Sequence, residues 1–319
     1  MIVTKPALRY MGGKFRLAPW LLQFFPGHEV YTEAFGGAAG VLLQKPRAIG
    51  EVYNDLDGEI VNFFSVLRHV DQREQLIEQL RLTPFARDEF DQAWEGDEDP
   101  VERARRLCVR AQMGFGSNGA HKKSTGMRQD LRRASANAMQ FWVNYPDCLA
   151  AVGQRLQGVL IENRPALEVL LQHDSPQTLH FIDPPYLHGT RVMRSNGGYR
   201  CEMSDEDHGE LLEVLLELRG MVIVSGYDSE LYSGMLGDWR REETDSRIAA
   251  GRGTKVPRQV AWLTPARAHA LVVSGTTIVL ALPSYLLIVG PNALQRIRGR
   301  WTQPEQGYFN LGKFGTPVA

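Results

Sequence analysis

The spacing of hydrophobic and polar residues changes along the chain. Short apolar runs, which predict strands, alternate with stretches of helical spacing. Short apolar runs bounded by polar or glycine-rich segments are typical of buried strands. Five such runs are expected to be strands, at residues 29–35, 49–53, 159–162, 178–182 and 221–225.

Other stretches place apolar residues three and four positions apart, which gives a helix one apolar face. Residues 59–82 and 103–113 follow this spacing, and residues 204–218 add Ser204 as an N-cap before an acidic first turn. Strands alternating with helices predict an α/β sheet, interrupted by a helical insertion from about residue 60 to 160.

The end of the chain has a different composition. Residues 270–295 carry no charge and are almost long enough to cross a bilayer. The polar run 274–277 and Pro283 oppose a spanning helix, so we favour two buried strands joined near residues 282–284. We therefore expect a β extension of unknown role over residues 266–319, without membrane contact. A partner contact and a membrane-associated segment are the alternatives.

Composition narrows the class of protein. Among 319 residues, 43% are hydrophobic and 23% are charged, as in a folded chain. The formal net charge of −1 argues against a globally basic protein that coats nucleic acid, although it leaves a local basic patch open. Three well-separated cysteines favour a reducing cytosol, and the N-terminus lacks the apolar core of a secretory signal. We expect a cytoplasmic protein of a bacterial or phage-infected cell.

Charge is arranged in two blocks. Residues 51–100 carry fourteen acidic and four basic side chains, whereas residues 101–164 carry eleven basic and four acidic ones. We expect the two blocks to lie on different surfaces. Residues 114–127 are rich in Gly, Ser and Lys without an apolar pattern, which predicts a loop among the basic helices.

The first candidate for chemistry is the sequence Asp183-Pro184-Pro185-Tyr186 at the end of the fourth expected strand. Two prolines end the hydrogen-bonded ladder, which leaves the Pro184 carbonyl free to accept from a ligand. Two acceptors, Asp183 and this carbonyl, beside the Tyr186 ring suit the exocyclic amino group of a planar base. The alternative is a strand-terminating turn with a half-buried tyrosine.

The second candidate is the glycine- and alanine-rich run at residues 34–40, which follows the first strand. Small residues allow close approach of a ligand, and a helix expected at residues 41–44 would favour an anion at its N-terminus. The run matches neither the dinucleotide-binding nor the P-loop pattern.

Two further segments complete the set. Asp55 ends the second strand about twenty residues later, where nucleotide-binding folds hold a carboxylate that accepts from ribose hydroxyls, while Asp57 is expected to cap the next helix. Residues 8–14, LRYMGGK, combine an aromatic residue, two glycines and a lysine. A surface lysine after a glycine turn is the simpler interpretation of that segment.

The order LRYMGGK, EAFGGAAG, YNDLD, a long insertion and FIDPPY resembles the Dam-like, D12 class of adenine-N6 DNA methyltransferases. The resemblance extends through Tyr199, the helix at 204–218 and residues 224–228 to residues 260–265, so it covers residues 6–265. It implies a Rossmann-like, S-adenosylmethionine-dependent sheet formed by residues 1–60 and 160–265. The helical insertion at 61–159 would then recognise the DNA target.

The resemblance also implies roles for single residues. Tyr10 and Lys14 would flank the methionine end of the cofactor, and Asp55 would bind its ribose. Tyr186 would stack on the flipped adenine, whose amino group Asp183 and the Pro184 carbonyl would hold. The implied cofactor-binding residues are Tyr10, Lys14, Glu33, Phe35, Gly36, Gly37, Gly40, Asp55 and Asp183. The implied catalytic residues are Asp183, Pro184, Pro185 and Tyr186.

Two positions depart from the family pattern. Arg164 follows Asn163 where relatives commonly have an acidic residue. The contact that the acidic residue would make with the cofactor's adenine is therefore not expected from this position. Gln259 stands where an acidic residue is more usual.

The implied reaction is methyl transfer to adenine N6 in duplex DNA by direct displacement after base flipping, without a covalent enzyme–base intermediate or a metal. Double-stranded DNA is the expected partner of a monomer that needs no other protein. The candidate DNA contacts are Lys122, Lys123, Arg128, Arg132 and Arg133. A solvated basic helix face is the alternative for these residues.

Rival functions share the same core. Cytosine-N4 enzymes usually have serine where this chain has Asp183, and glutamine-N5 protein methyltransferases have asparagine. A DNA-binding regulator that has lost catalysis would also keep the scaffold. The acidic residue at position 183 favours adenine.

Overall fold

The computed structural model describes residues 3–120, 126–129, 137–190, 198–245 and 258–265. The expected β extension at 266–319 lies outside these residues, as do four of the candidate DNA contacts, Lys122, Lys123, Arg132 and Arg133. In the described parts of the chain, no helix combines the length and the apolar character that crossing a membrane requires.

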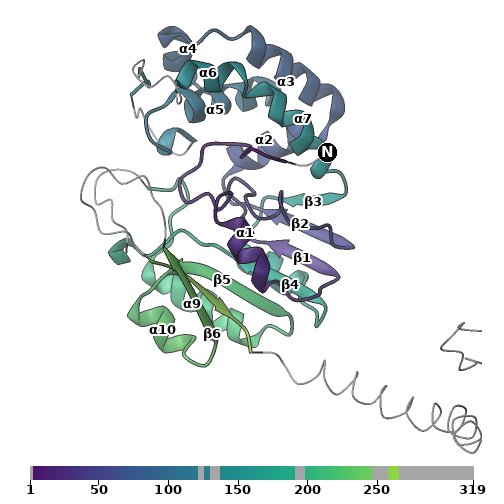
Figure 1. Ribbon diagram of the computed structural model, residues 1–319, viewed down its shortest axis with the longest axis vertical. Coiled ribbons are helices and arrows are strands. Elements are labelled where there is room, and N and C mark those ends of the chain that lie inside the picture. The colour runs from purple at the N-terminus through teal and green to yellow at the C-terminus, as the bar shows by residue number, and fades with distance from the viewer. Residues whose placement is uncertain (1–2, 121–125, 130–136, 191–197, 246–257, 266–319) are drawn as a thin grey trace, which may run out of the picture. The chain divides into compact units, whose positions relative to one another are not determined.

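The centre of the fold is a seven-stranded sheet in the order β3-β2-β1-β4-β5-β7-β6 (Figure 1). Strands β1 to β5 pair in parallel, whereas β7 is antiparallel to both β5 and β6. The strands are β1 (Val30–Glu33), β2 (Gly50–Asn54), β3 (Val159–Glu162), β4 (Thr178–Ile182), β5 (Met221–Tyr227), β6 (Arg240–Asp245) and β7 (Arg258–Leu263). All five predicted strands are confirmed, β3 and β4 with the predicted bounds.

The strand order reverses between β1 and β4, because the chain runs outward from β1 to β3 and then returns to the other side of β1. Such a switch point leaves a crevice at the carboxyl ends of the strands, where open α/β sheets bind ligands. Three of the predicted motifs follow β1, β2 and β4, so the topology brings them to one edge.

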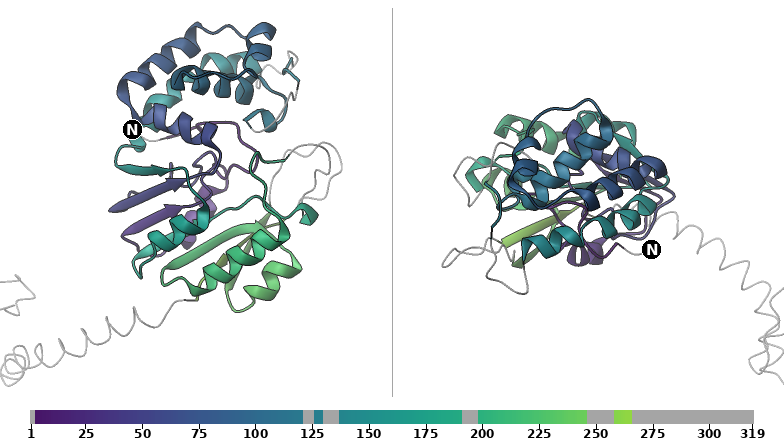
Figure 2. Two further views of the ribbon diagram at one scale, coloured as in Figure 1. Left: turned by 180° about the vertical axis from the view of Figure 1, so that it is seen from behind. Right: turned by 90° about the horizontal axis from the view of Figure 1, so that it is seen from above.

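Helices cover both faces of the sheet (Figures 1 and 2). On one face, Tyr31, Tyr53 and Phe181 pack in a core with α2 and the N-terminal segment. On the other, Ile182 and Val224 pack against α8, α9 and α10. Successive strand residues thus point to opposite layers, which explains why these strands are almost continuously apolar.

The described α-helices have the following bounds. They are α1 (Ala18–Leu21), α2 (Gly58–Arg68), α3 (Val70–Leu82), α4 (Arg87–Gln92), α5 (Pro100–Met113), α6 (Ala138–Val143), α7 (Pro146–Arg155), α8 (Ala166–Gln172), α9 (Asp205–Glu217) and α10 (Glu230–Met235). Asp57 caps α2 and Ser204 caps α9 in a capping box with Asp207, as predicted for both caps.

The chain between β2 and β3 is helical, as predicted, and α3 to α7 gather beyond the β3 edge of the sheet (Figure 1). The helical segment predicted at 59–82 is two helices, because His69 is extended and separates α2 from α3. The expected loop at 114–127 is anchored by a bridge between Gly114 and Met127, and Met127 packs against the core.

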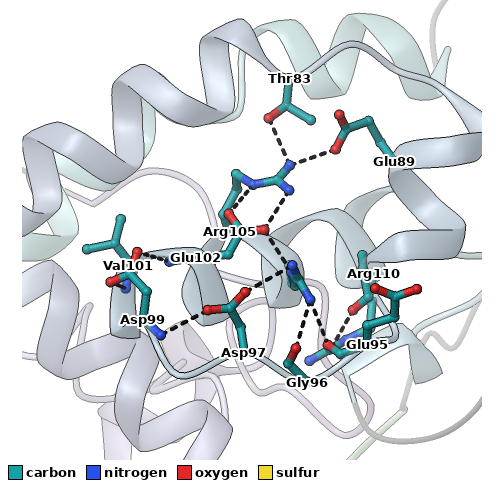
Figure 3. Close-up of polar contacts among 12 residues, drawn as sticks. Thr83, Glu89, Glu95, Gly96, Asp97, Asp99, Val101, Glu102, Arg105 and Arg110 are labelled. Carbon is teal, nitrogen blue, oxygen red and sulfur yellow. Dashed lines mark hydrogen bonds and ion pairs between the residues drawn. The ribbon is translucent and has the colours of Figure 1, made fainter.

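The expectation that the acidic and basic blocks lie on different surfaces is wrong. Arg105 of the basic block pairs with Glu89 of the acidic block at 2.8 Å, and with Glu102 of its own block at 2.6 Å (Figure 3). Arg106 also pairs with Glu102, at 2.7 Å. Further pairs join the two blocks: Arg103–Glu59, Arg106–Asp97, Arg110–Glu59, Arg155–Glu51 and Arg81–Asp147. Much of the basic charge on α5 therefore neutralises neighbouring acids, because the helices that carry the two blocks pack side by side.

Candidate active site

A cavity opens at the carboxyl ends of β1, β2 and β4, the position that the topology predicts. The cavity and its open mouth together contain about 840 Å³ of space that no protein atom fills. Predicted site residues that line it are Tyr10, Lys14, Glu33, Phe35, Gly36, Gly37, Gly40, Asp55, Asp183 and Pro185. Four motifs that are distant in sequence thus meet in one cavity.

The turn after β1 has tight contacts with its neighbours, which require small residues. A Cβ atom on Gly36 would overlap the Tyr53 ring, and one on Gly37, whose φ is +47°, would lie 2.8 Å from Tyr10 Cε1. The glycines therefore shape the cavity wall through contacts within the protein. No cavity-facing helix follows, contrary to prediction: residues 41–44 form turns, and the Leu42 amide donates to Glu33 Oε2.

Asp55 is fixed by backbone donors. Its Oδ2 accepts from the Gly37 amide and its Oδ1 from the Asp57 amide, both at 2.8 Å. Burial raises the pKa of Asp55 to about 6, although these hydrogen bonds act in the opposite direction. The carboxylate is thereby held at the cavity wall, next to the glycine turn.

Asn54 is a positioning residue that the sequence motifs did not single out. Its Nδ2 donates to the carbonyls of Ala34 and Arg164, at 2.9 and 3.0 Å, and its Oδ1 accepts from the Arg164 amide at 3.0 Å. It therefore ties the turn after β1 to the loop after β3. Asn163 also donates to the Asp55 carbonyl at 2.7 Å, next to Arg164, the position that departs from the family pattern.

Glu33 is only 3% exposed at the end of β1. Its Oε2 accepts from the Tyr31 hydroxyl at 3.1 Å and from the Leu42 amide at 2.9 Å. Burial raises the pKa of Glu33 to about 8, which exceeds the opposing effect of these donors. The side chain therefore holds a proton for part of the time at neutral pH.

Asp183 faces the cavity from the end of β4 and forms an ion pair with Lys14. The distance from Lys14 Nζ to Asp183 Oδ2 is 2.7 Å, and the side chains are 7% and 16% exposed. Burial raises the pKa of Asp183, while the Lys14 charge and hydrogen bond act to lower it. The two predicted motifs 8–14 and 183–186 are therefore in direct contact.

Tyr186 lies behind Asp183 and does not line the main cavity. It is 9% exposed and packs edge-on against Tyr227 with ring centroids 4.6 Å apart. Its hydroxyl donates to Asp183 Oδ1 at 3.3 Å and accepts from Gln259 Nε2 at 2.9 Å. The unusual glutamine at position 259 thus belongs to the support of this site.

A segment at residues 199–203 adds to the cavity wall, and the sequence identified only its Tyr199. Arg200 pairs with Asp57 across 3.4 Å, which connects this segment to the end of β2. A Cβ on Gly12 would collide with the Tyr199 hydroxyl, so the segment packs closely on the turn at Gly12. No local signal marks Arg200, because its role depends on a contact between distant parts of the chain.

Comparison with protein-family models supplies the decisive observation: residues 10–243 match the D12 class N6 adenine-specific DNA methyltransferase family. The chain belongs to this family. The comparison with curated proteins found no match. The match begins at Tyr10 and ends within β6, so it includes every residue that lines the cavity.

Membership makes this methyltransferase an adenine-specific DNA-modifying enzyme that uses S-adenosylmethionine. The cavity fits that cofactor chemically. Glu33, Asp55 and Asp183 bring three carboxyl groups to a wall that also includes Phe35, and the cofactor carries a positive charge, hydroxyls and an aromatic base. Among the residues described, no group of His, Cys, Asp or Glu side chains is arranged to hold a metal ion.

Proposed function

We propose that the enzyme flips adenine out of duplex DNA and methylates its N6 by direct in-line transfer. The observation that carries this proposal is the position of Asp183, whose carboxylate faces the same cavity as the glycine turn and Asp55. Asp183 is a hydrogen-bond acceptor at the carboxyl end of β4, and it lies beside the wall formed by the glycine turn and Asp55. This arrangement suits a reaction in which the cofactor's nucleoside and the target adenine nucleoside are bound next to each other.

The cofactor side of the cavity is formed by residues after β1 and β2. S-adenosylmethionine, when bound, supplies an electrophilic methyl group. Asp55 accepts from ribose hydroxyls, and Glu33 and the turn Gly36–Gly40 face the amino acid and the sulfonium. Tyr10 closes this wall, because its ring packs against Gly37. These assignments rest on the chemistry of each side chain and on its place in the cavity.

The catalytic side consists of Asp183-Pro184-Pro185-Tyr186. Asp183 and the Pro184 carbonyl accept hydrogen bonds from the two N–H groups of the amino nitrogen, which directs its lone pair toward the methyl group. The nitrogen–methyl bond forms as the sulfur–methyl bond breaks, and the nitrogen then releases one proton. Such alignment can contribute several kcal/mol, on the order of the gain in oriented intramolecular reactions. Because the amino nitrogen is out of reach inside a stacked duplex, the base must leave the stack.

The helical insertion at residues 61–159 is proposed to read the DNA target. Since α5 uses much of its positive charge internally, we propose that the phosphates are contacted by other basic residues of the insertion, Lys122, Lys123, Arg128, Arg132 and Arg133. Arg128 is partly exposed at the anchored end of this loop.

The proposal is tested with labelled cofactor and a duplex that contains adenine. Asp183→Asn keeps the shape of the side chain and removes its charge, so we expect methyl transfer to fall by at least about 100-fold while duplex binding is kept. Glu29→Gln, at an exposed carboxylate just before β1, serves as the control and should transfer normally.

Three results would contradict the proposal. An inactive wild type that binds duplex tightly would indicate a DNA-binding regulator. Label on cytosine N4 would indicate the rival base, and an Asp183→Asn variant with full activity would remove Asp183 from the mechanism.

A further inference from the structure

Lys14 is held at the catalytic carboxylate by three contacts. Its Nζ donates to the Gly12 carbonyl at 2.7 Å, lies 2.7 Å from Asp183 Oδ2 and lies 4.8 Å from the centroid of the Tyr186 ring. The Lys14 carbonyl accepts from the amides of Leu17 and Ala18, which fixes the backbone at this position. The side chain is therefore directed at Asp183 and is 7% exposed.

The other groups around Asp183 offer no positive charge. Glu33 lies on the neighbouring strand β1 and repels the carboxylate, while the Tyr186 hydroxyl and Ser225 donate to it. Tyr232 on α10 is a further titratable neighbour. Among the residues that the structure describes, Lys14 is the one basic side chain paired with Asp183.

The protonation state of Asp183 decides what it can do for the amino group. A carboxylate accepts hydrogen bonds at both oxygens, whereas a protonated carboxyl donates from one of them. The amino group of adenine has two N–H donors. The O–H group of a protonated Asp183 would face one of these donors and could not accept a hydrogen bond from it. Burial favours the protonated form, and an adjacent ammonium offsets that tendency.

We propose that Lys14 is a positioning residue that keeps Asp183 ionised and oriented as a hydrogen-bond acceptor for the target amino group. This inference rests on the proposed function, and it differs from a contact with the methionine end of the cofactor. The contacts of Nζ support it, because two of them, to Asp183 and the Tyr186 ring, are made to the catalytic motif.

The direct test follows the Asp183 carboxyl carbon by NMR in ligand-free protein labelled with 13C-aspartate. Asp183→Asn assigns the resonance. We expect Lys14→Gln to raise the pKa of Asp183 by at least about 1 pH unit, and Lys14→Arg to leave it nearly unchanged. Lys14→Met provides a second neutral variant if Lys14→Gln does not fold.

Arg105→Gln is the matched control, because it removes a partly buried cation that has two acidic partners in the helical insertion. It should lower stability without moving the Asp183 titration. An Asp183 pKa that stays within about 0.3 pH units of wild type in the folded neutral variants would overturn the inference.

The same variants are compared in single-turnover methylation from about pH 5 to 9. We expect the acid limb of the rate profile to move to higher pH in Lys14→Gln and to return toward wild type in Lys14→Arg. A rate lowered equally at every pH would overturn the inference and leave the proposed function standing. A raised Asp183 pKa in a chain that transfers no methyl group would overturn the proposed function instead.

Discussion

Gln259 donates a hydrogen bond from Nε2 to the Tyr186 hydroxyl over 2.9 Å, in a site where Gln259 is 3% exposed. Because the hydroxyl oxygen accepts from Gln259, its hydrogen is available to Asp183 Oδ1. The same Nε2 lies within hydrogen-bond distance of Ser225 Oγ and the Gly226 carbonyl. Strand β7 therefore supports the proposed catalytic motif, residues 183–186, from the side away from the cavity.

This arrangement predicts that Gln259→Leu weakens catalysis. Loss of one buried hydrogen bond costs about 1–3 kcal/mol, so we expect the methyl-transfer rate to fall about tenfold or more through misplacement of Tyr186. Steady-state kinetics with duplex DNA measure the effect. Gln177→Leu, at an exposed glutamine, is the control, and equal rates in the two variants would contradict the prediction.

The raised pKa of Glu33 leads us to expect that cofactor binding releases a proton. Burial raises the pKa of Glu33 to about 8, so its carboxyl holds a proton for part of the time at about pH 7.5 before a ligand is added. A cationic ligand favours the carboxylate, and the proton then leaves. Calorimetry with S-adenosylmethionine in two buffers of different ionisation enthalpy measures this release.

Glu33→Gln should abolish the buffer dependence of the binding heat, whereas Glu29→Gln should keep it. Binding heats that are the same in both buffers for the wild type would show that Glu33 does not titrate on binding.

The ion pairs of α5 predict a division between structural and DNA-binding arginines. Arg128→Gln should weaken duplex binding and lower the slope of log affinity against log salt by about 1. Arg105→Gln should leave that slope unchanged and lower the free energy of unfolding, because it leaves Glu89 and Glu102 without this partner. A lower salt slope in Arg105→Gln and an unchanged slope in Arg128→Gln would contradict the prediction and indicate that α5 contacts the DNA.

The buried ion pairs of Glu51 should make a pH-dependent contribution to the free energy of unfolding. Its carboxylate, 2% exposed, lies 2.8 Å from Lys45 Nζ and 2.6 Å from Arg155, so Glu51→Gln should cost about 3–5 kcal/mol in urea unfolding. Burial alone would raise the pKa of Glu51, but hydrogen bonds from Arg155 and Lys45 outweigh it and lower the pKa.

The contribution of a carboxyl with a lowered pKa is complete above its ordinary pKa and is lost as the pH falls through the folded value. The difference between wild type and Glu51→Gln should therefore shrink below about pH 4.5. Asp147→Asn breaks the exposed pair with Arg81 and should cost less than about 1 kcal/mol. Equal costs for the two variants would contradict the buried role of Glu51.

Elements with a strong local signal could be predicted from the sequence. Strands β3 and β4 have the predicted bounds, because their apolar runs are bounded by polar residues. The caps at Asp57 and Ser204 were predicted because a cap depends on residues within one turn. Strand β6 (Arg240–Asp245) carries five charged residues among six and became a strand only by pairing with β7.

The sequence by itself determined the order of strands and helices and the residue types available for chemistry, because periodicity, capping and motif order are local properties. Tertiary structure alone decided that acidic and basic blocks neutralise each other, that residues 41–44 turn instead of forming a helix, and that Lys14 meets Asp183. Each of these depends on Coulomb attraction or a hydrogen bond between groups in different segments of the chain, whose distances are set only when the sheet and its helices pack.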